Sequence, residues 1–253
     1  MTPPIPDYPA LFLDVDGTLL PISLRPGPPR PTPELLRLLE RLSRALHGAL
    51  ALLSGRTLAT LVELFKPLSI PAAGTHGLEI RFRDGAIQRR DSAPPVFNEA
   101  RRELEVLARD DPGLYLEDKE NALAIHYRAS PDRADELRQS VNAIARRLGP
   151  DYHVQEGLYV LELKPAGINK GTALRQFMES HPFLGRTPIA VGDDLTDLHA
   201  FAQAEMLGGF GVAIGDRIAA RWQITDPATL HHWLENVIRR SNAIVWDDGR
   251  PFR

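Results

Sequence analysis

The chain has 253 residues and no cysteine, which excludes disulfides, thiol catalysis and thiolate metal sites. Hydrophobic residues make up 43% and charged residues 25%, as in an ordinary globular protein of one large or two moderate domains. The net charge of −3 argues against a nucleic-acid partner. The chain starts without a signal-peptide pattern and has no apolar run near the roughly 20 residues that span a bilayer, which argues against a membrane partner. We expect a cytoplasmic protein.

A short apolar run, residues 11–13, predicts a buried strand that ends at a ligand site. Asp14 and Asp16 follow two residues apart, so both carboxylates project to the same side. Gly17 permits a sharp turn whose N–H groups can face an anion. Two carboxylates beside an anion cradle indicate phosphate chemistry on a divalent metal. The pattern also occurs in turns and calcium loops, but residues 19–25 lack the further oxygen ligands of an EF-hand.

The next segments predict a parallel sheet. Residues 21–33 are rich in proline and form a loop, after which Thr32 caps a helix with Pro33 at its first position. A buried strand at 49–53 ends in Ser54-Gly55-Arg56, and a helix over about 57–65 completes a βαβα pattern. Ser54 at the strand end can bind a phosphoryl oxygen, although a serine there is often only a helix cap.

From residue 70 the pattern changes. Residues 70–80 predict a strand, a glycine-rich turn and a second strand, and Asp84-Gly85 predicts a hairpin. A unit of one helix and two strands then occurs twice, which predicts an inserted α+β domain over residues 89–164, between core segments 1–88 and 165–253. Its predicted elements are helices at about 95–109 and 131–148 and strands at about 113–118, 121–128, 151–156 and 158–164.

The parallel pattern then resumes. Asn169-Lys170-Gly171 opens a helix whose N-terminus favours anions. The apolar strand at 188–191 ends in Gly192-Asp193-Asp194-Leu195-Thr196-Asp197, which brings these carboxylates to the same sheet edge as Asp14. A helix, a strand at 210–214 and a helix at about 227–239 complete the predicted fold, and the tail after Ser241 carries no readable signal.

These four motifs, in this order, resemble those of the haloacid dehalogenase superfamily of phosphatases. The resemblance implies an α/β fold: a Rossmann-like core with a parallel sheet flanked by helices, plus the inserted α+β domain as a cap. Its chemistry implies that Asp14 attacks phosphorus and that Asp16 first protonates the leaving oxygen and then activates water. Ser54 and Lys170 would bind the phosphoryl oxygens.

Mg2+ prefers oxygen ligands, so it is the expected cofactor. Asp14, the main-chain carbonyl of Asp16 and Asp193 would bind it directly. Asp194 and Asp197 would hold its waters or orient Lys170. The candidate metal-binding residues are therefore Asp14, Asp16, Asp193, Asp194 and Asp197.

The predicted cap determines the substrate. Its sequence carries Glu-x-Lys (117–119), His-Tyr-Arg (126–128) and Glu-x-Lys-Pro (162–165), and Gly-x-His-Gly-Leu-Glu (74–79) precedes it. Together these resemble trehalose-6-phosphate phosphatases over about residues 10–235. The resemblance implies that Glu117, Lys119 and Glu162 contact sugar hydroxyls, although such residues also occur on solvated sheet faces. The candidate substrate-binding residues are Arg56, His76, Glu117, Lys119, His126, Arg128, Glu162 and Lys164.

The sequence thus predicts hydrolysis of trehalose 6-phosphate to trehalose and phosphate, with functional coupling to a trehalose-6-phosphate synthase. A second hypothesis keeps the chemistry and changes the sugar phosphate, to sucrose phosphate or mannosyl-phosphoglycerate. A third is a non-catalytic sugar-phosphate sensor, in which loss of Asp14 or Asp16 would be expected. Both carboxylates are present.

Overall fold

The computed structural model describes residues 2–22, 29–89, 94–243, 246–247 and 250–251. The chain divides into two compact units. Unit 1 comprises Met1–Gln88 and Asn169–Arg253, and unit 2 comprises Arg89–Ile168. Unit 1 is therefore discontinuous in the sequence, with unit 2 inserted into it.

Unit 1 contains an eight-stranded sheet in the order β12-β11-β10-β1-β2-β3-β4-β5. Its central strand β1 (Pro9–Asp14) pairs in parallel with β10 (Thr187–Gly192) and β2 (Leu50–Leu53). Every residue of β1 and β2 is buried, as expected of strands that helices cover on both faces. The remaining strands are β3 (Ala72–Gly74), β4 (Glu79–Arg81), which is antiparallel to β3, β5 (Ile87–Arg89), β11 (Phe210–Ile214) and β12 (Trp222–Ile224).

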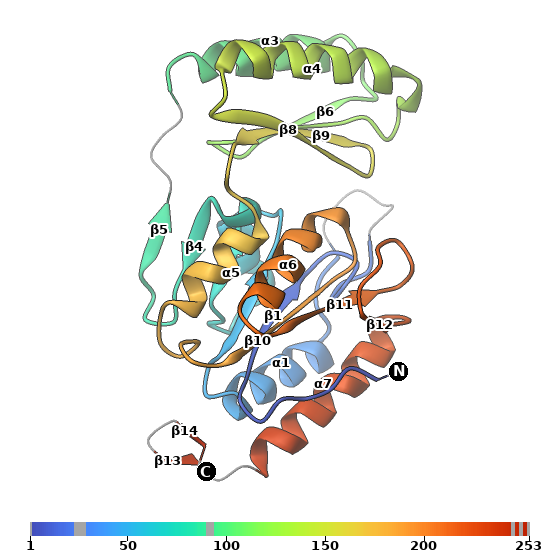
Figure 1. Ribbon diagram of the computed structural model, residues 1–253. Coiled ribbons are helices and arrows are strands. Elements are labelled where there is room, and N and C mark those ends of the chain that lie inside the picture. Colours follow the sequence, from blue (N-terminus) through green and yellow to red (C-terminus); the bar gives the residue numbers. More distant parts are fainter. Residues whose placement is uncertain (1, 23–28, 90–93, 244–245, 248–249, 252–253) are drawn as a thin grey trace. The chain divides into compact units, whose positions relative to one another are not determined.

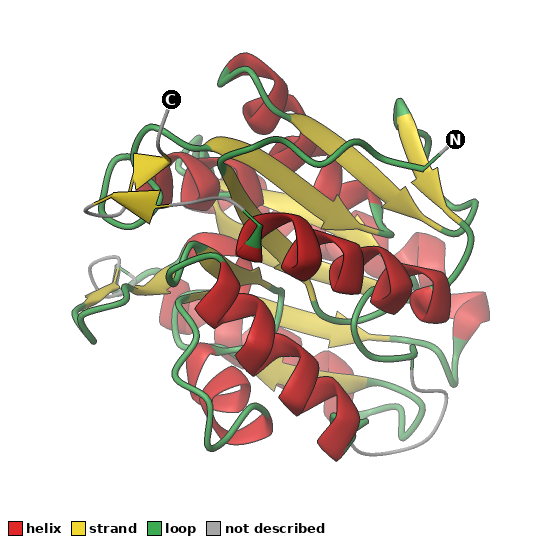
Figure 2. Cartoon of the chain, turned by 90° about the horizontal axis from the view of Figure 1, so that it is seen from below, coloured by secondary structure: helices red, strands yellow, loops and turns green. Residues whose placement is uncertain are grey.

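Helices lie on both sides of these strands (Figure 2). The helices of unit 1 are α1 (Pro33–Ala45), α2 (Leu58–Leu64), α5 (Lys170–Met178), α6 (Leu198–Met206) and α7 (Pro227–Asn242), with 3-10 turns η1 (Thr75–Gly77) and η3 (Leu195–Asp197). Helix α1 packs against α7, and α5 packs against α6. Right-handed crossovers place these two pairs on opposite faces of the sheet. Thr32 caps α1, as predicted, by accepting a hydrogen bond from the N–H of Leu35 at 3.2 Å.

Unit 2 has one sheet covered on one face by two helices (Figure 1). The sheet is antiparallel, in the order β6-β7-β9-β8. Leu137, Val141 and Ile144 of α4 (Ala134–Leu148) recur at helical spacing and are buried in the core of this unit. Its elements are α3 (Phe97–Arg109), β6 (Tyr115–Asp118), β7 (Leu123–His126), η2 (Pro131–Arg133), α4 (Ala134–Leu148), β8 (Tyr152–Gly157) and β9 (Val160–Pro165).

The predicted fold class, a parallel α/β core with an inserted α+β unit, is confirmed. The helix predicted from residue 131 begins as a 3-10 turn, η2, before α4 starts at Ala134. Residues 23–28 of the proline-rich loop lie outside the described residues, and the tail contributes the short strands β13 (Trp246–Asp247) and β14 (Arg250–Pro251). Among the described residues, no helix is long and apolar enough to cross a membrane.

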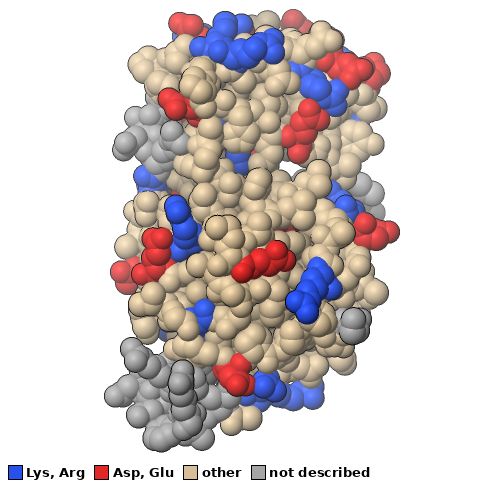
Figure 3. All heavy atoms as spheres, viewed as in Figure 1, with Lys and Arg blue, Asp and Glu red and all other residues tan. Residues whose placement is uncertain are grey.

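Charged side chains of both signs occur on the face of each unit that Figure 3 shows. On the face that Figure 3 shows, Lys and Arg side chains are interspersed with Asp and Glu, and no continuous area of one sign covers the described surface of either unit. This mixture of signs on the face shown agrees with the small net charge of −3.

Candidate active site

Three neighbouring parallel strands bring the predicted core residues to one sheet edge. Strand β1 ends at Asp14, β2 is followed by Ser54, and β10 is followed by Asp193. Asp14 lies beside Leu53 in the register of β1 and β2, so Ser54 is the next residue along that edge. Ligands of parallel α/β sheets bind at such carboxyl ends.

Lys170 links two of the carboxylates. It is the first residue of α5, only 3% exposed, and its Nζ lies 2.6 Å from Oδ1 of Asp14 and 2.6 Å from Oδ1 of Asp197. Burial alone would lower the pKa of the Lys170 ammonium, but the charges of Asp14 and Asp197 outweigh burial and raise it. Lys170 is therefore a fixed cation beside Asp14.

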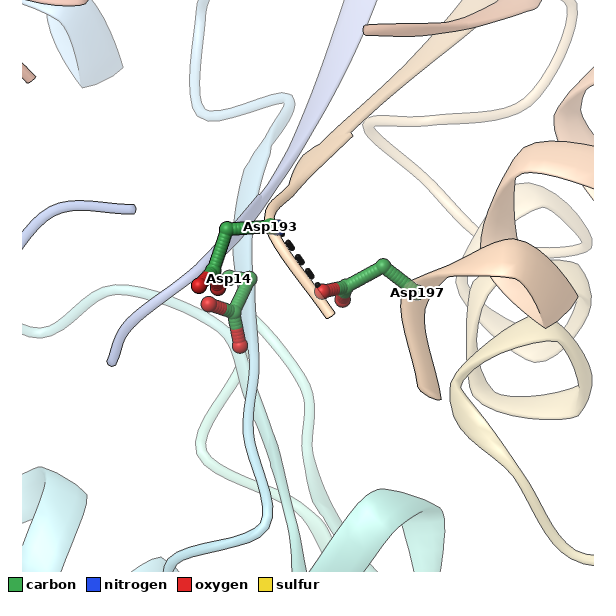
Figure 4. Close-up of side chains that lie close together, drawn as sticks. All are labelled: Asp14, Asp193 and Asp197. Carbon is green, nitrogen blue, oxygen red and sulfur yellow. Dashed lines mark hydrogen bonds between the residues drawn. The ribbon is translucent and has the colours of Figure 1, made fainter. Parts of the chain in front are cut away.

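Asp197 holds the acidic turn together (Figure 4). Its Oδ2 accepts hydrogen bonds from the N–H groups of Asp193 and Asp194, at 3.1 and 3.0 Å. Gly192 makes this close approach possible, because a Cβ there would lie 2.1 Å from Cγ of Asp197. Of the two alternatives for Asp197, water holding or orientation of Lys170, the contacts favour the second.

The same edge carries a buried group of carboxylates that could hold a metal ion. Ligand atoms of Asp14, Asp193 and Asp197 all lie within 4.8 Å of one another. Oδ2 of Asp14 and Oδ1 of Asp193 are buried and have no hydrogen-bond partner among the described residues. Burial is the main cause that raises the pKa of Asp14 well above its usual value and that of Asp193 to about 6, and the nearby Asp197 charge adds to both. This excess of negative charge fits a divalent cation.

Two predicted metal residues lie outside this group of three. The carboxylate of Asp194 caps η3 by accepting a hydrogen bond from the N–H of Leu195. The side chain of Asp16, which was expected to contribute only its carbonyl to the metal, accepts two hydrogen bonds from Arg56, at 2.6 and 2.5 Å. The main-chain N–H of Arg56 in turn donates to Oγ of Ser54 at 3.1 Å. Arg56 therefore contacts both Asp16 and Ser54.

His76 lies against the same segment. The main-chain N–H of His76 donates a hydrogen bond to the main-chain carbonyl of Ser54 at 2.8 Å. A Cβ on Gly55 would lie 2.7 Å from Nε2 of the His76 ring. The φ of His76 is +56°, a left-handed conformation that is uncommon for a residue with a side chain. His76 thus fixes the backbone of residues 54–56, while Arg56 faces Asp16.

The predicted cap residues form a second cluster, within unit 2. In the sheet register, Glu117 of β6 and Glu162 of β9 flank Ala124 of β7, so both carboxylates lie on one face. Nζ of Lys119 lies 3.0 Å from Oε1 of Glu162 and 3.9 Å from Oε2 of Glu117. Nε2 of His126 lies 3.1 Å from Oε2 of Glu117.

The contacts within this second cluster favour the ionised form of Glu117. Burial would raise the pKa of Glu117, but the hydrogen bond from His126 and the charge of Lys119 outweigh it, and the pKa of Glu117 is lowered. Lys164 shares the face of Glu162, two residues along β9, and is 1% exposed. The guanidinium of Arg128 lies 5.7 Å from the ring centroid of Tyr159.

One residue of the core site was not predicted. Arg217, in the loop after β11, donates from Nη1 to Oδ2 of Asp193 at 2.8 Å and from Nη2 to Oδ2 of Asp194 at 3.0 Å. A single arginine in a polar loop follows no periodicity or motif, so no pattern along the chain predicts this contact.

Comparison with known proteins adds independent information. The sequence profile of the trehalose-phosphatase family matches residues 12–224. A probable trehalose-phosphate phosphatase of Sinorhizobium fredii is 42% identical over 211 residues, which are 83% of this chain and 79% of the relative. The trehalose-6-phosphate phosphatase of Escherichia coli is 37% identical over 244 residues, 94% and 91% of the two chains.

Solved structures share the fold. A trehalose-6-phosphate phosphatase related protein is similar with a TM-score of 0.77 and 26% identity, over 92% of this chain and 98% of that one. The C-terminal domain of the C. albicans trehalose-6-phosphate phosphatase is similar with a TM-score of 0.80 at 20% identity, over 92% of each chain, and supports the fold alone.

Proposed function

Because the chain belongs to the trehalose-phosphatase family, we propose that it hydrolyses trehalose 6-phosphate to trehalose and inorganic phosphate. The observation that carries the chemistry is the buried Lys170, which bridges Asp14 and Asp197. Beside it lie one oxygen of Asp14 and one of Asp193 that have no hydrogen-bond partner within the described part of the chain. A phosphate monoester hydrolyses very slowly in water, so a site must supply a nucleophile and offset charge. These residues supply both.

Asp14 attacks phosphorus, and the bond from phosphorus to the sugar oxygen breaks as an aspartyl-phosphate forms. Asp16 donates a proton to the leaving oxygen and then removes one from the water that releases phosphate. Its two hydrogen bonds from Arg56 hold the carboxylate in a fixed orientation and stabilise its ionised form between the two steps. Lys170 and Ser54 bind phosphoryl oxygens.

The acidic group fits Mg2+, which when bound would offset phosphoryl charge. Asp14, Asp193 and the main-chain carbonyl of Asp16 would hold it. Asp197 positions Lys170 and the backbone of Asp193, so its role in the metal site is indirect.

We propose that unit 2 is the cap and that its cluster of Glu117, Lys119, His126 and Glu162 binds the sugar. Alternating acceptors and donors at 3.0–3.9 Å suit neighbouring hydroxyls, each of which both donates and accepts. Lys164, Arg128, Arg56 and His76 remain proposed substrate contacts. The substrate would come from a trehalose-6-phosphate synthase, the proposed functional partner.

Phosphate release tests the proposal. The panel is trehalose 6-phosphate, sucrose 6-phosphate, glucose 6-phosphate and mannosyl-phosphoglycerate, with Mg2+ and with EDTA. We expect a strong preference for trehalose 6-phosphate and a loss of at least about a thousandfold in Asp14→Asn, roughly 4 kcal/mol of transition-state stabilisation. Faster release from another sugar phosphate would refute the substrate assignment alone. No release from any of them would favour a sensor.

A further inference from the structure

We propose that Arg217 is the counter-cation of the metal site: its guanidinium neutralises Asp193 and Asp194 in the metal-free protein and thereby weakens the binding of the divalent ion. This inference rests on the proposed metal site. It adds a residue that acts on the ion through the carboxylates and does not touch substrate.

The geometry of the Arg217 guanidinium supports this role. Nη1 and Nη2 reach different residues, Oδ2 of Asp193 at 2.8 Å and Oδ2 of Asp194 at 3.0 Å. Two contacts from one planar group fix both carboxylates at once. The side chain of Asp193 is 5% exposed, whereas that of Arg217 is 35% exposed. Solvent therefore reaches the cation, which can move outward without opening the core.

The charge balance explains why a counter-cation is needed. Asp14, Asp193 and Asp197 form the buried group, and Lys170 contacts two of them, Asp14 and Asp197. Asp193 is the member for which Arg217 is the bonded cation. Burying a carboxylate without a cation is costly, so Arg217 stabilises the site while no metal is bound.

The same contact opposes metal binding without blocking it. Oδ1 of Asp193 is buried and has no hydrogen-bond partner among the described residues, so one oxygen remains for the ion. A guanidinium on the other oxygen repels that ion and withdraws negative charge from its ligand. The ion and Arg217 thus share one carboxylate.

Four proteins test the inference: the wild type, Arg217→Gln, Arg217→Lys and Arg37→Gln. Arg37 is the matched control, because its side chain is 65% exposed, it pairs with Glu34 on α1, and its loss changes the net charge equally. The Mg2+ dissociation constant is measured by titration calorimetry, without substrate. Melting temperatures are measured in EDTA and in saturating Mg2+.

For Arg217→Gln we expect Mg2+ to bind about tenfold more tightly, from removal of one positive charge near a partly exposed site. In EDTA it should melt about 2–4 °C below the wild type, and Mg2+ should narrow this gap. Arg217→Lys keeps the charge but cannot bridge both carboxylates. Its Mg2+ affinity and its melting temperature in EDTA should lie between those of the wild type and Arg217→Gln. Arg37→Gln should match the wild type in Mg2+ affinity.

Unchanged or weaker Mg2+ binding in Arg217→Gln would overturn the inference and leave the proposed function intact. If that variant does not fold, an unchanged dissociation constant in Arg217→Lys would do the same. A wild-type protein that binds no Mg2+ would instead overturn the metal site itself.

Discussion

The contact between Asp197 and Lys170 can be tested with one isosteric change, Asp197→Asn. The asparagine oxygen can still accept the N–H groups of Asp193 and Asp194, at 3.1 and 3.0 Å in the wild type. Its NH2 group then faces the ammonium of Lys170, where Oδ1 lies 2.6 Å away in the wild type. The change therefore removes one buried ion pair and places two donors against each other.

The expected loss in the free energy of unfolding depends on the contacts that Lys170 keeps in the variant. Removing one partner of a buried ion pair costs about 3–5 kcal/mol. Lys170 keeps its 2.6 Å contact with Asp14, and loss of the Asp197 charge relieves repulsion at Asp14 and Asp193. We therefore expect a loss of about 2 kcal/mol in the free energy of unfolding, or about 4–8 °C in melting temperature for a chain of this size. The kcat should fall about a hundredfold, because Lys170 is then held by Asp14 alone and its ammonium is less precisely placed.

Thermal unfolding in EDTA, followed by circular dichroism, gives the answer. Asp194→Asn is the matched control, because the side chain of Asp194 is 30% exposed and asparagine is an equally good cap. It should melt within about 2 °C of the wild type. Equal melting temperatures for Asp197→Asn and the wild type would show that the buried pair does not stabilise the fold.

Two further predictions concern pH and the sugar cluster. Burial raises the pKa of Asp193 in the fold from 3.8 to about 6, so its contribution to the stability of the metal-free protein is full below pH 3.8 and is lost as pH rises through about 6. In EDTA, the difference in melting temperature between the wild type and Asp193→Asn (wild type minus variant) should fall as the pH rises from 3.8 to about 6. A difference that rises with pH would contradict this prediction. Glu162→Gln should raise KM for trehalose 6-phosphate about tenfold and leave hydrolysis of p-nitrophenyl phosphate within about twofold, since it alters the partner of Lys119 in unit 2. Equal losses on both esters would argue against a sugar-binding role.

Much of the architecture could be predicted because it follows from patterns along the chain. The runs that form β1 and β10 are continuously apolar and end in acidic residues, which predicts parallel neighbours with carboxylates at one edge. The N-caps Thr32 and Asn169 are equally visible in sequence. These features depend on residues close together in the chain.

Partner choice at the site could not be predicted in the same way. Whether Asp194 or Asp197 orients Lys170 depends on the 3-10 turn η3, which points Asp197 back toward its own backbone. The contacts of Arg56 with Asp16 and of Arg217 with Asp193 join residues that are 40 and 24 positions apart, respectively, through long side chains. Such contacts produce no periodic pattern in the sequence from which they could be predicted.

The insertion of unit 2 into unit 1 has a consequence for the order of folding. Unit 2 is continuous, Arg89–Ile168, and its core is built from its own residues, so its contacts can form as soon as that stretch has been synthesised. Strand β1 can pair with β2 before unit 2 is synthesised, but its other neighbour, β10, is synthesised only after unit 2. The pairing of β1 with β10 therefore cannot form until residues up to Gly192 have been synthesised, and until then one edge of β1 has no neighbouring strand. Folding of the inserted unit shortens the span that β1 and β10 must then close.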